Sequence, residues 1–212
     1  VDVLTHEAGH ALEGYLAARS PKNIPEDIQC PGMESAEIHS MSMEFLTAPW
    51  HHLFFKEDTD KYELLHAEDS FIFLPYGCMV DEFQHIMYQQ PDLTPDERNA
   101  VWLELEKKYR PWNKFGDLPF YGRGAGWQRQ LHIFECPFYY IDYCLASVCA
   151  MQFKVMMDED FEKAWKNYYK LCNLSARDFF TNVIVEAGLN SPFEDGCMEK
   201  LVDKFEKKAF NR

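Results

Sequence analysis

Residues 6–10 read His-Glu-Ala-Gly-His, and both the fold and the chemistry of the chain can be worked out from this stretch. At 3.6 residues per turn, His6 and His10 lie one turn apart on the same helical face, so both imidazoles can reach one tetrahedral cation. Zinc is the cation that suits such ligands best. Glu7 lies about 100° around the helix from His6, where its carboxylate can contact a metal-bound water. The stretch predicts a helix that carries a zinc site and its general base.

The residues around this motif predict a largely buried helix over residues 1–19. Apolar side chains recur there at helical spacing, and neither a proline nor a run of β-branched residues interrupts the stretch. Gly9 lowers the helix propensity, and a glycine inside a helix commonly allows something to approach the backbone closely. We expect another helix or the substrate to approach Gly9.

A catalytic zinc needs a third protein ligand. The candidates downstream of His10 are Glu26, Asp27, Glu34, Glu37, His39 and Glu44. Glu37 and Glu44 are two helical turns apart on one face, so Glu44 could hydrogen-bond the back of a ligand if Glu37 binds the metal. His39 lies about 160° around the helix from Glu37. The alternative is that these acids form a solvated face, as most charged residues do.

The composition limits the kinds of partner. The chain has 212 residues, of which 47% are hydrophobic and 16% aromatic, so it can bury a large core. It contains no uninterrupted apolar run of about 18 residues that would span a bilayer. The net charge of -14 argues against nucleic acid and anionic membrane surfaces, because both require a basic patch. Neutral or cationic ligands are more compatible with this charge.

The cysteines indicate a reducing environment. There are seven, an odd number without a CxxC pair, and most lie in apolar segments. We interpret them as reduced core residues of a cytoplasmic protein. The chain also lacks an initiator Met and begins inside the zinc helix, so we expect a fragment whose preceding N-terminal region is absent. The oligomeric state stays open.

Helical periodicity extends over most of the remaining chain, without an alternating β pattern, an internal repeat or a low-complexity tract. Pro75 and Gly77 indicate a kink or a break into two helices, and Thr94 followed by Pro95 and two acids predicts a helix start. We expect helices over residues 35–46, 59–89, 94–109, 128–157, 158–172, 175–187 and 192–210, with a stop at Gly188 and loops over 20–34 and 111–126. One all-α domain over residues 1–212 is the simplest organisation.

Two segments resemble a known family. Residues 4–11, Leu-Thr-His-Glu-Ala-Gly-His-Ala, and residues 37–45, Glu-Ile-His-Ser-Met-Ser-Met-Glu-Phe, are similar to the catalytic core of the thimet oligopeptidase and oligoendopeptidase F family of zinc peptidases, and more closely to its oligoendopeptidase F branch. The resemblance implies that His6, His10 and Glu37 bind one Zn2+ per chain and that Glu44 supports a ligand from behind. The interval after His10 is slightly longer than in thimet-type members. A loop insertion around residues 25–31 explains this length and leaves Glu34 as an alternative ligand.

A second block resembles the substrate-binding loop and the tyrosine-rich helix of the same family. It comprises residues 124–134 and 137–143. The phenol groups of Tyr140 and Tyr143 are three residues apart on one helical face, and each can donate a hydrogen bond to an oxyanion. The alternative is that the aromatic rings pack in a core with satisfied hydroxyls. The spacing does not fix which tyrosine faces the metal.

Further residues of this block are expected to hold the substrate. His132 could bind the substrate's backbone, and we expect Tyr139, Gly124 and Gly126 to contact the substrate. The glycines also suggest a flexible loop that closes over a bound peptide, although a plain connector fits them equally. The other histidines lack ligand spacing and are expected to be structural: His51, His52, His66 and His85.

The resemblance implies an all-α, multi-helical catalytic domain, the C-terminal part of a larger helical peptidase. It also implies a zinc-dependent endopeptidase that hydrolyses internal bonds of short peptides, with Glu7 as the general base. The alternative is a non-catalytic helical binding or scaffold module with a retired metal site. A thermolysin-like metallohydrolase fits less well, because Cys30 and Pro31 occupy the region where that class carries an acidic ligand.

Overall fold

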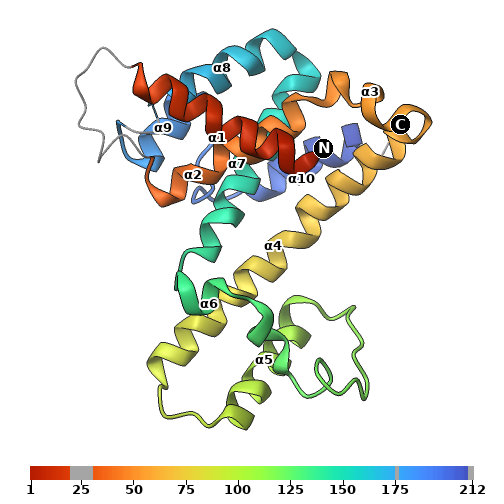
Figure 1. Ribbon diagram of the computed structural model, residues 1–212, viewed down its shortest axis with the longest axis vertical. Helices are drawn as coiled ribbons and strands as arrows, with labels where there is room; N and C mark the ends of the chain where they lie inside the picture. Colours follow the sequence, from red (N-terminus) through yellow and green to blue (C-terminus); the bar gives the residue numbers. More distant parts are fainter. Residues whose placement is uncertain (20–30, 175–176, 210–212) are drawn as a thin grey trace. The chain divides into compact units, whose positions relative to one another are not determined.

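The computed structural model describes residues 1–19, 31–174 and 177–209 (Figure 1), and in these ranges it contains helices and no β-strand. The expected all-α fold is confirmed. None of the helices in the described ranges combines the length and the apolar character needed to cross a membrane.

The chain divides into two compact units. Unit 1 contains Val1–Ser70 and Leu145–Arg212, and unit 2 contains Phe71–Cys144. The elements of unit 1 are α1 (Asp2–Ala18), α2 (Met33–Leu46), η2 (Ala48–Trp50), α3 (His52–Phe55), η3 (Lys56–Asp58), α8 (Phe161–Leu174), α9 (Phe180–Glu186) and α10 (Cys197–Ala209). Those of unit 2 are α5 (Pro95–Tyr109), η4 (Ala125–Arg129) and α6 (His132–Glu135). The helices α4 (Thr59–Gln89) and α7 (Tyr140–Glu159) contribute to both units. The expectation of one domain over residues 1–212 stays a prediction.

Each unit has its own buried apolar cluster. The cluster of unit 1 gathers side chains from α1, α2, α7, α8 and α9, among them Ile38, Phe153 and Tyr168, which are fully buried. The cluster of unit 2 is aromatic, with Phe83, Trp102 and Trp127 in contact. Burial of an aromatic ring removes 150–250 Å² of surface from water, so rings supply a large part of the stability of a small unit.

Helices α1 and α2 pack side by side in unit 1 (Figure 1). Gly9 lies at their contact, because a Cβ atom built on it would meet the carbonyl oxygen of His39 at 2.4 Å. The approach of another helix to Gly9 is therefore confirmed. The expectation of a largely buried α1 is wrong: Gly9, Glu13, Leu16 and Ala17 are its buried residues, whereas Leu4 is 71% exposed.

Several helix ends follow directly from the sequence. At the start of α5, the Thr94 hydroxyl accepts a hydrogen bond from the backbone N–H of Glu97, and the Glu97 carboxylate accepts one from the backbone N–H of Thr94. This reciprocal capping pair satisfies two backbone donors that the first helical turn leaves free. Helix α9 stops where expected, since Gly188 follows its end with a φ of +78°, which L-residues with a Cβ rarely adopt.

Other boundaries differ from the expectations. Helix α4 is continuous through Pro75, so the proposed break into two helices is wrong. A helix over 128–157 is also wrong, because η4 and α6 precede α7, which begins only at Tyr140. Pro137 and the positive φ of Phe138, +65°, interrupt that stretch. Helix α10 begins at Cys197 instead of residue 192, after a turn with Gly196 at a φ of +77°.

The six cysteines in the described ranges are free thiols. Cys144, Cys149, Cys172 and Cys197 are buried, whereas Cys136 is exposed. The prediction of reduced core cysteines is thus confirmed for most of them. Cys30 lies outside the described residues.

Candidate metal centre

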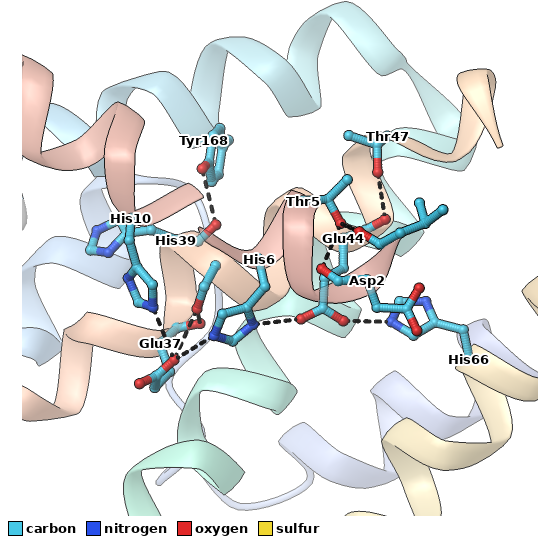
Figure 2. A network of polar contacts seen from close by, with 12 residues as sticks. Asp2, Thr5, His6, His10, Glu37, His39, Glu44, Thr47, His66 and Tyr168 are labelled. Carbon is cyan, nitrogen blue, oxygen red and sulfur yellow. Dashed lines mark hydrogen bonds and ion pairs between the residues drawn. The ribbon is translucent and has the colours of Figure 1, made fainter. Parts of the chain in front are cut away.

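The candidate metal centre lies at the contact of α1 and α2, where two imidazoles and a carboxylate converge (Figure 2). His6 and His10 come from successive turns of α1, and Glu37 comes from α2. The potential ligand atoms of these three residues all lie within 4.8 Å of one another. Of all the His, Cys, Asp and Glu side chains in the described ranges, only these three form a group that could hold a metal ion.

The distances within this group suit zinc. The Nε2 atoms of His6 and His10 lie 3.2 Å and 3.4 Å from Oε2 of Glu37. Two ligand atoms that each bind zinc at about 2.0–2.1 Å in tetrahedral geometry are roughly 3.3–3.4 Å apart. Two imidazole nitrogens and one carboxylate oxygen are also a ligand set typical of catalytic zinc sites.

Glu37 is held in position by its own helix. Its side chain is 9% exposed, and the Ser40 hydroxyl lies 3.0 Å from Oε2 and 2.9 Å from the backbone carbonyl oxygen of Glu37. A buried carboxylate with a fixed rotamer is a pre-organised ligand. The alternative ligand Glu34 is exposed at the start of α2, and Glu26 and Asp27 lie outside the described residues. The geometry therefore favours Glu37.

Glu44 lies behind His6, as Figure 2 shows. Its Oε1 atom is 2.7 Å from Nδ1 of His6, so the Nδ1–H group donates to Glu44 and leaves Nε2 free to bind a metal. Its Oε2 atom is 2.8 Å from Nε2 of His66, a residue of α4. Nothing in the spacing of the residues indicated this second contact, because His66 is 22 residues from Glu44 on a different helix.

The two carboxylates control the protonation of His6 in the metal-free chain. Hydrogen bonds to Glu37 and Glu44 raise the pKa of His6 to about 9, against the opposing effect of burial. Burial also raises the pKa of Glu44, but hydrogen bonds from His6 and His66 outweigh it, and the net pKa of Glu44 is lowered. At neutral pH the ring of His6 is therefore protonated on both nitrogens, with Nδ1–H directed to Glu44 and Nε2–H to Glu37. A cation that binds Nε2 displaces the proton on that nitrogen.

Glu7 follows His6 on α1, and its side chain is exposed. His39 is fully buried and is not part of the metal group. Its Nδ1 atom lies 3.1 Å from the carbonyl oxygen of Ala36, and its own carbonyl oxygen accepts a hydrogen bond from the Tyr168 hydroxyl at 3.0 Å (Figure 2). His39 therefore ties α2 into the core of unit 1.

We expect the buried His39 to make the fold sensitive to acid. Burial, together with the charge of His10, lowers the pKa of His39 to about 4. Because this value lies below the unfolded value of 6.5, neutral His39 stabilises the fold fully above pH 6.5, and the contribution is lost as the pH falls toward 4. At 1.36 kcal/mol per pKa unit, the loss is about 3 kcal/mol.

Urea unfolding of the metal-free protein at several pH values measures this loss. His39→Asn keeps a donor near the Ala36 carbonyl but does not titrate, so its free energy of unfolding should fall by about 3 kcal/mol less than that of the wild type over the same pH range. His52→Asn is the matched control, because the exposed His52 makes the same kind of bond, from Nδ1 to the Pro49 carbonyl at 3.0 Å. An unchanged pH dependence in His39→Asn would contradict the assignment.

Unit 2 brings the expected substrate-binding side chains together around His132. The centroid of its ring lies 5.0 Å from that of Tyr140, 5.7 Å from that of Tyr143 and 6.3 Å from that of Tyr139. Tyr140 and Tyr143 share the first turn of α7, with ring centroids 5.5 Å apart. Burial raises the pKa of Tyr140, so its hydroxyl stays a proton donor at neutral pH.

A hydrogen-bond chain that the sequence did not indicate orients His132. The Tyr76 hydroxyl donates to Oε1 of Gln130 at 2.8 Å, and Nε2 of Gln130 lies 2.7 Å from Nδ1 of His132. When the amide donates to Nδ1, the neutral ring of His132 carries its proton on Nε2. That nitrogen is then a hydrogen-bond donor.

Gly124 and Gly126 are buried. Gly124 has a φ of +82°, and a Cβ atom on it would meet the carbonyl oxygen of Asn99 at 2.1 Å. A Cβ atom on Gly126 would meet Nε1 of Trp102 at 2.8 Å. Close packing within unit 2 thus explains both glycines, and their contact with a substrate stays a prediction.

Comparisons with known proteins give a consistent result. The model of the family described as peptidase family M3 matches residues 1–199. No curated protein gives a significant match.

Three solved structures resemble the chain over nearly its whole length. A chain assigned as an oligoendopeptidase F is 50% identical, with a TM-score of 0.93 over 98% of this chain and 36% of its own. PZ peptidase A with an inhibitor is 46% identical, with a TM-score of 0.94 over 100% of this chain and 37% of its own. A chain assigned as an oligoendopeptidase F from Bacillus anthracis is 40% identical, with a TM-score of 0.83 over 100% of this chain and 34% of its own. The chain therefore spans about a third of the length of these structures.

Proposed function

Since the chain belongs to peptidase family M3, we propose that it carries the catalytic centre of a zinc-dependent endopeptidase that hydrolyses internal bonds of short peptides. The observation that carries this proposal is the convergence of His6, His10 and Glu37 within 4.8 Å, with Glu7 beside them on α1. The similarity to oligoendopeptidase F chains supports the substrate class.

Under this proposal, His6, His10 and Glu37 hold Zn2+. When bound, zinc would supply Lewis acidity, which lowers the pKa of water and polarises a peptide carbonyl. Glu7 accepts the proton of the attacking water and passes it to the leaving amine. Its exposure leaves the carboxylate accessible to water and to substrate.

The aromatic cluster of unit 2 supplies donors for the substrate. The hydroxyl of Tyr143, or that of Tyr140, donates to the oxyanion that forms when the carbonyl is attacked. His132 donates from Nε2 to a carbonyl of the substrate's backbone, in the tautomer that Gln130 favours. Tyr139 contacts the same substrate segment. The net charge of -14 favours neutral or cationic peptides over acidic ones.

Metal content and peptide cleavage test the proposal on the full-length protein. We expect about one zinc per chain by elemental analysis, and internal cleavage of a quenched-fluorescence peptide, with the products identified by mass spectrometry. An intact folded protein should be cleaved far more slowly than the peptide. A protein that binds no zinc and cleaves no peptide would instead be a binding or scaffold module with a retired metal site.

A further inference from the structure

The Glu44 carboxylate is shared between two histidines, one atom for each. Oε1 lies 2.7 Å from Nδ1 of His6, and Oε2 lies 2.8 Å from Nε2 of His66 (Figure 2). All three side chains are largely buried, with exposed fractions of 25% for His6, 15% for Glu44 and 13% for His66. In such surroundings, a carboxylate oxygen without a donor is costly, and a hydrogen bond to a charged group is strong.

The ring of His66 is itself held in place. Its centroid lies 4.4 Å from that of Phe45 on α2 and 5.9 Å from that of Tyr62, whose ring is nearly parallel to it. The Tyr62 hydroxyl in turn donates to Oδ1 of Asp2 on α1 at 2.5 Å. His66 is therefore a donor with a fixed direction, on a third helix that is tied to both helices of the metal group.

The consequence for Glu44 is a fixed rotamer. A carboxylate with one donor can rotate about its terminal torsion, whereas two donors on its two oxygens define a single orientation. A fixed Glu44 keeps the ring of His6 in the tautomer and the direction in which Nε2 faces Glu37, 3.2 Å away. His66 can thus influence the metal group without touching it.

We propose that His66 is a positioning residue that sets the zinc affinity of the centre by orienting Glu44 and, through it, His6. This inference rests on the proposed zinc function. It assigns a role toward the metal group to a residue that lacks ligand spacing and was expected to be structural.

A double-mutant cycle on the full-length protein tests the inference, with the zinc dissociation constant measured by competition with a chromogenic chelator. His66→Phe keeps an aromatic ring between Phe45 and Tyr62 but removes the donor, and we expect it to weaken zinc binding about 10- to 100-fold, the usual effect of losing such a support. Glu44→Gln should weaken binding to a similar extent. Because His66 acts through Glu44, the double variant should bind zinc about as weakly as Glu44→Gln alone.

A second substitution at the same position separates positioning from packing. The amide nitrogen of Gln can take the place of Nε2 of histidine, so His66→Gln should retain zinc affinity within about threefold of the wild type. His52→Phe is the matched control, because His52 is exposed and lies outside this network. Circular dichroism and urea unfolding of each metal-free variant report whether it folds, and if His66→Phe does not fold, His66→Leu replaces it in the cycle.

The outcomes are distinct. Wild-type affinity in a folded His66→Phe, equal losses in His66→Phe and His66→Gln, or additive losses in the double variant would each overturn the role of His66. A wild-type protein that binds no zinc would instead overturn the proposed function.

Discussion

Glu7→Gln is expected to lower kcat/KM for a short peptide by about 10³-fold while zinc stays bound. The two side chains have nearly the same size, but the amide cannot accept a proton, and general base catalysis contributes typically 10²–10⁴ in rate. Glu7 is exposed and is not part of the metal group, so its replacement leaves the three ligands in place. Steady-state assays with a quenched-fluorescence peptide measure kcat/KM, and elemental analysis of the same sample measures the zinc content.

Two controls accompany this variant. Glu34→Gln changes an exposed glutamate at the start of α2 and should leave both zinc content and turnover unchanged. It also tests Glu34 as the alternative third ligand, since a ligand variant would lose zinc. Wild-type enzyme treated with a chelator should lose activity and regain it with added zinc. If Glu7→Gln kept most of its turnover, or lost its zinc, Glu7 would not be the base.

Gly9→Ala is expected to destabilise unit 1, although alanine is the better helix former. A Cβ atom at position 9 would lie 2.4 Å from the carbonyl oxygen of His39 and 2.7 Å from Cα of Ser40, and both are backbone atoms of α2 that cannot rotate away. The helices would have to separate at the point where the metal ligands meet. Overpacking costs about 1–3 kcal/mol, and against fixed backbone atoms the cost should lie in the upper part of this range, above the gain of about 1 kcal/mol in helix propensity.

Gly14→Ala, on the same helix, is the matched control. Apart from the neighbouring residues and the backbone of α1 itself, no atom lies within 4 Å of a Cβ built there, so this substitution should be neutral or stabilise the protein by up to about 1 kcal/mol. Urea unfolding of the metal-free variants gives the free energies, and chelator competition gives the zinc affinities. We expect Gly9→Ala to weaken zinc binding as well, because α1 carries His6 and His10 while α2 carries Glu37. Equal stability of the two variants would rule out the close helix contact.

Parts of the fold were predictable wherever the signal lies within a few residues. The helix start at Thr94 and the stop at Gly188 depend on local backbone geometry, and both occur as expected. Pro75 carries an equally local signal, yet α4 continues through it. An interior proline removes one helical hydrogen bond and crowds the carbonyl four residues before it, and the full burial of Met79, Val80 and Phe83 in the following turns offsets this cost.

The wrong predictions for α1 and for residues 128–157 share a physical cause. The apolar residues of α1 at helical spacing suggested a buried helix, but burial depends on which elements pack against it, and Leu4 is exposed while Glu13 is buried. The helix expected over 128–157 is interrupted at Phe138, whose positive φ is stabilised by tertiary contacts such as the hydrogen bond from its N–H to Oε1 of Gln84. Periodicity carries no information about such contacts.

The sequence by itself determined the all-α class, the spacing that puts His6 and His10 on one face of a helix, and the seven-residue interval between Glu37 and Glu44. These follow from helical geometry, which depends only on neighbouring residues. The tertiary structure decided between Glu37, which the resemblance implied, and Glu34, and it decided that a helix is what approaches Gly9. It alone showed that His66 reaches Glu44 from α4. Each of these depends on how separate helices cross, and crossing is set by the packing of side chains distant in sequence.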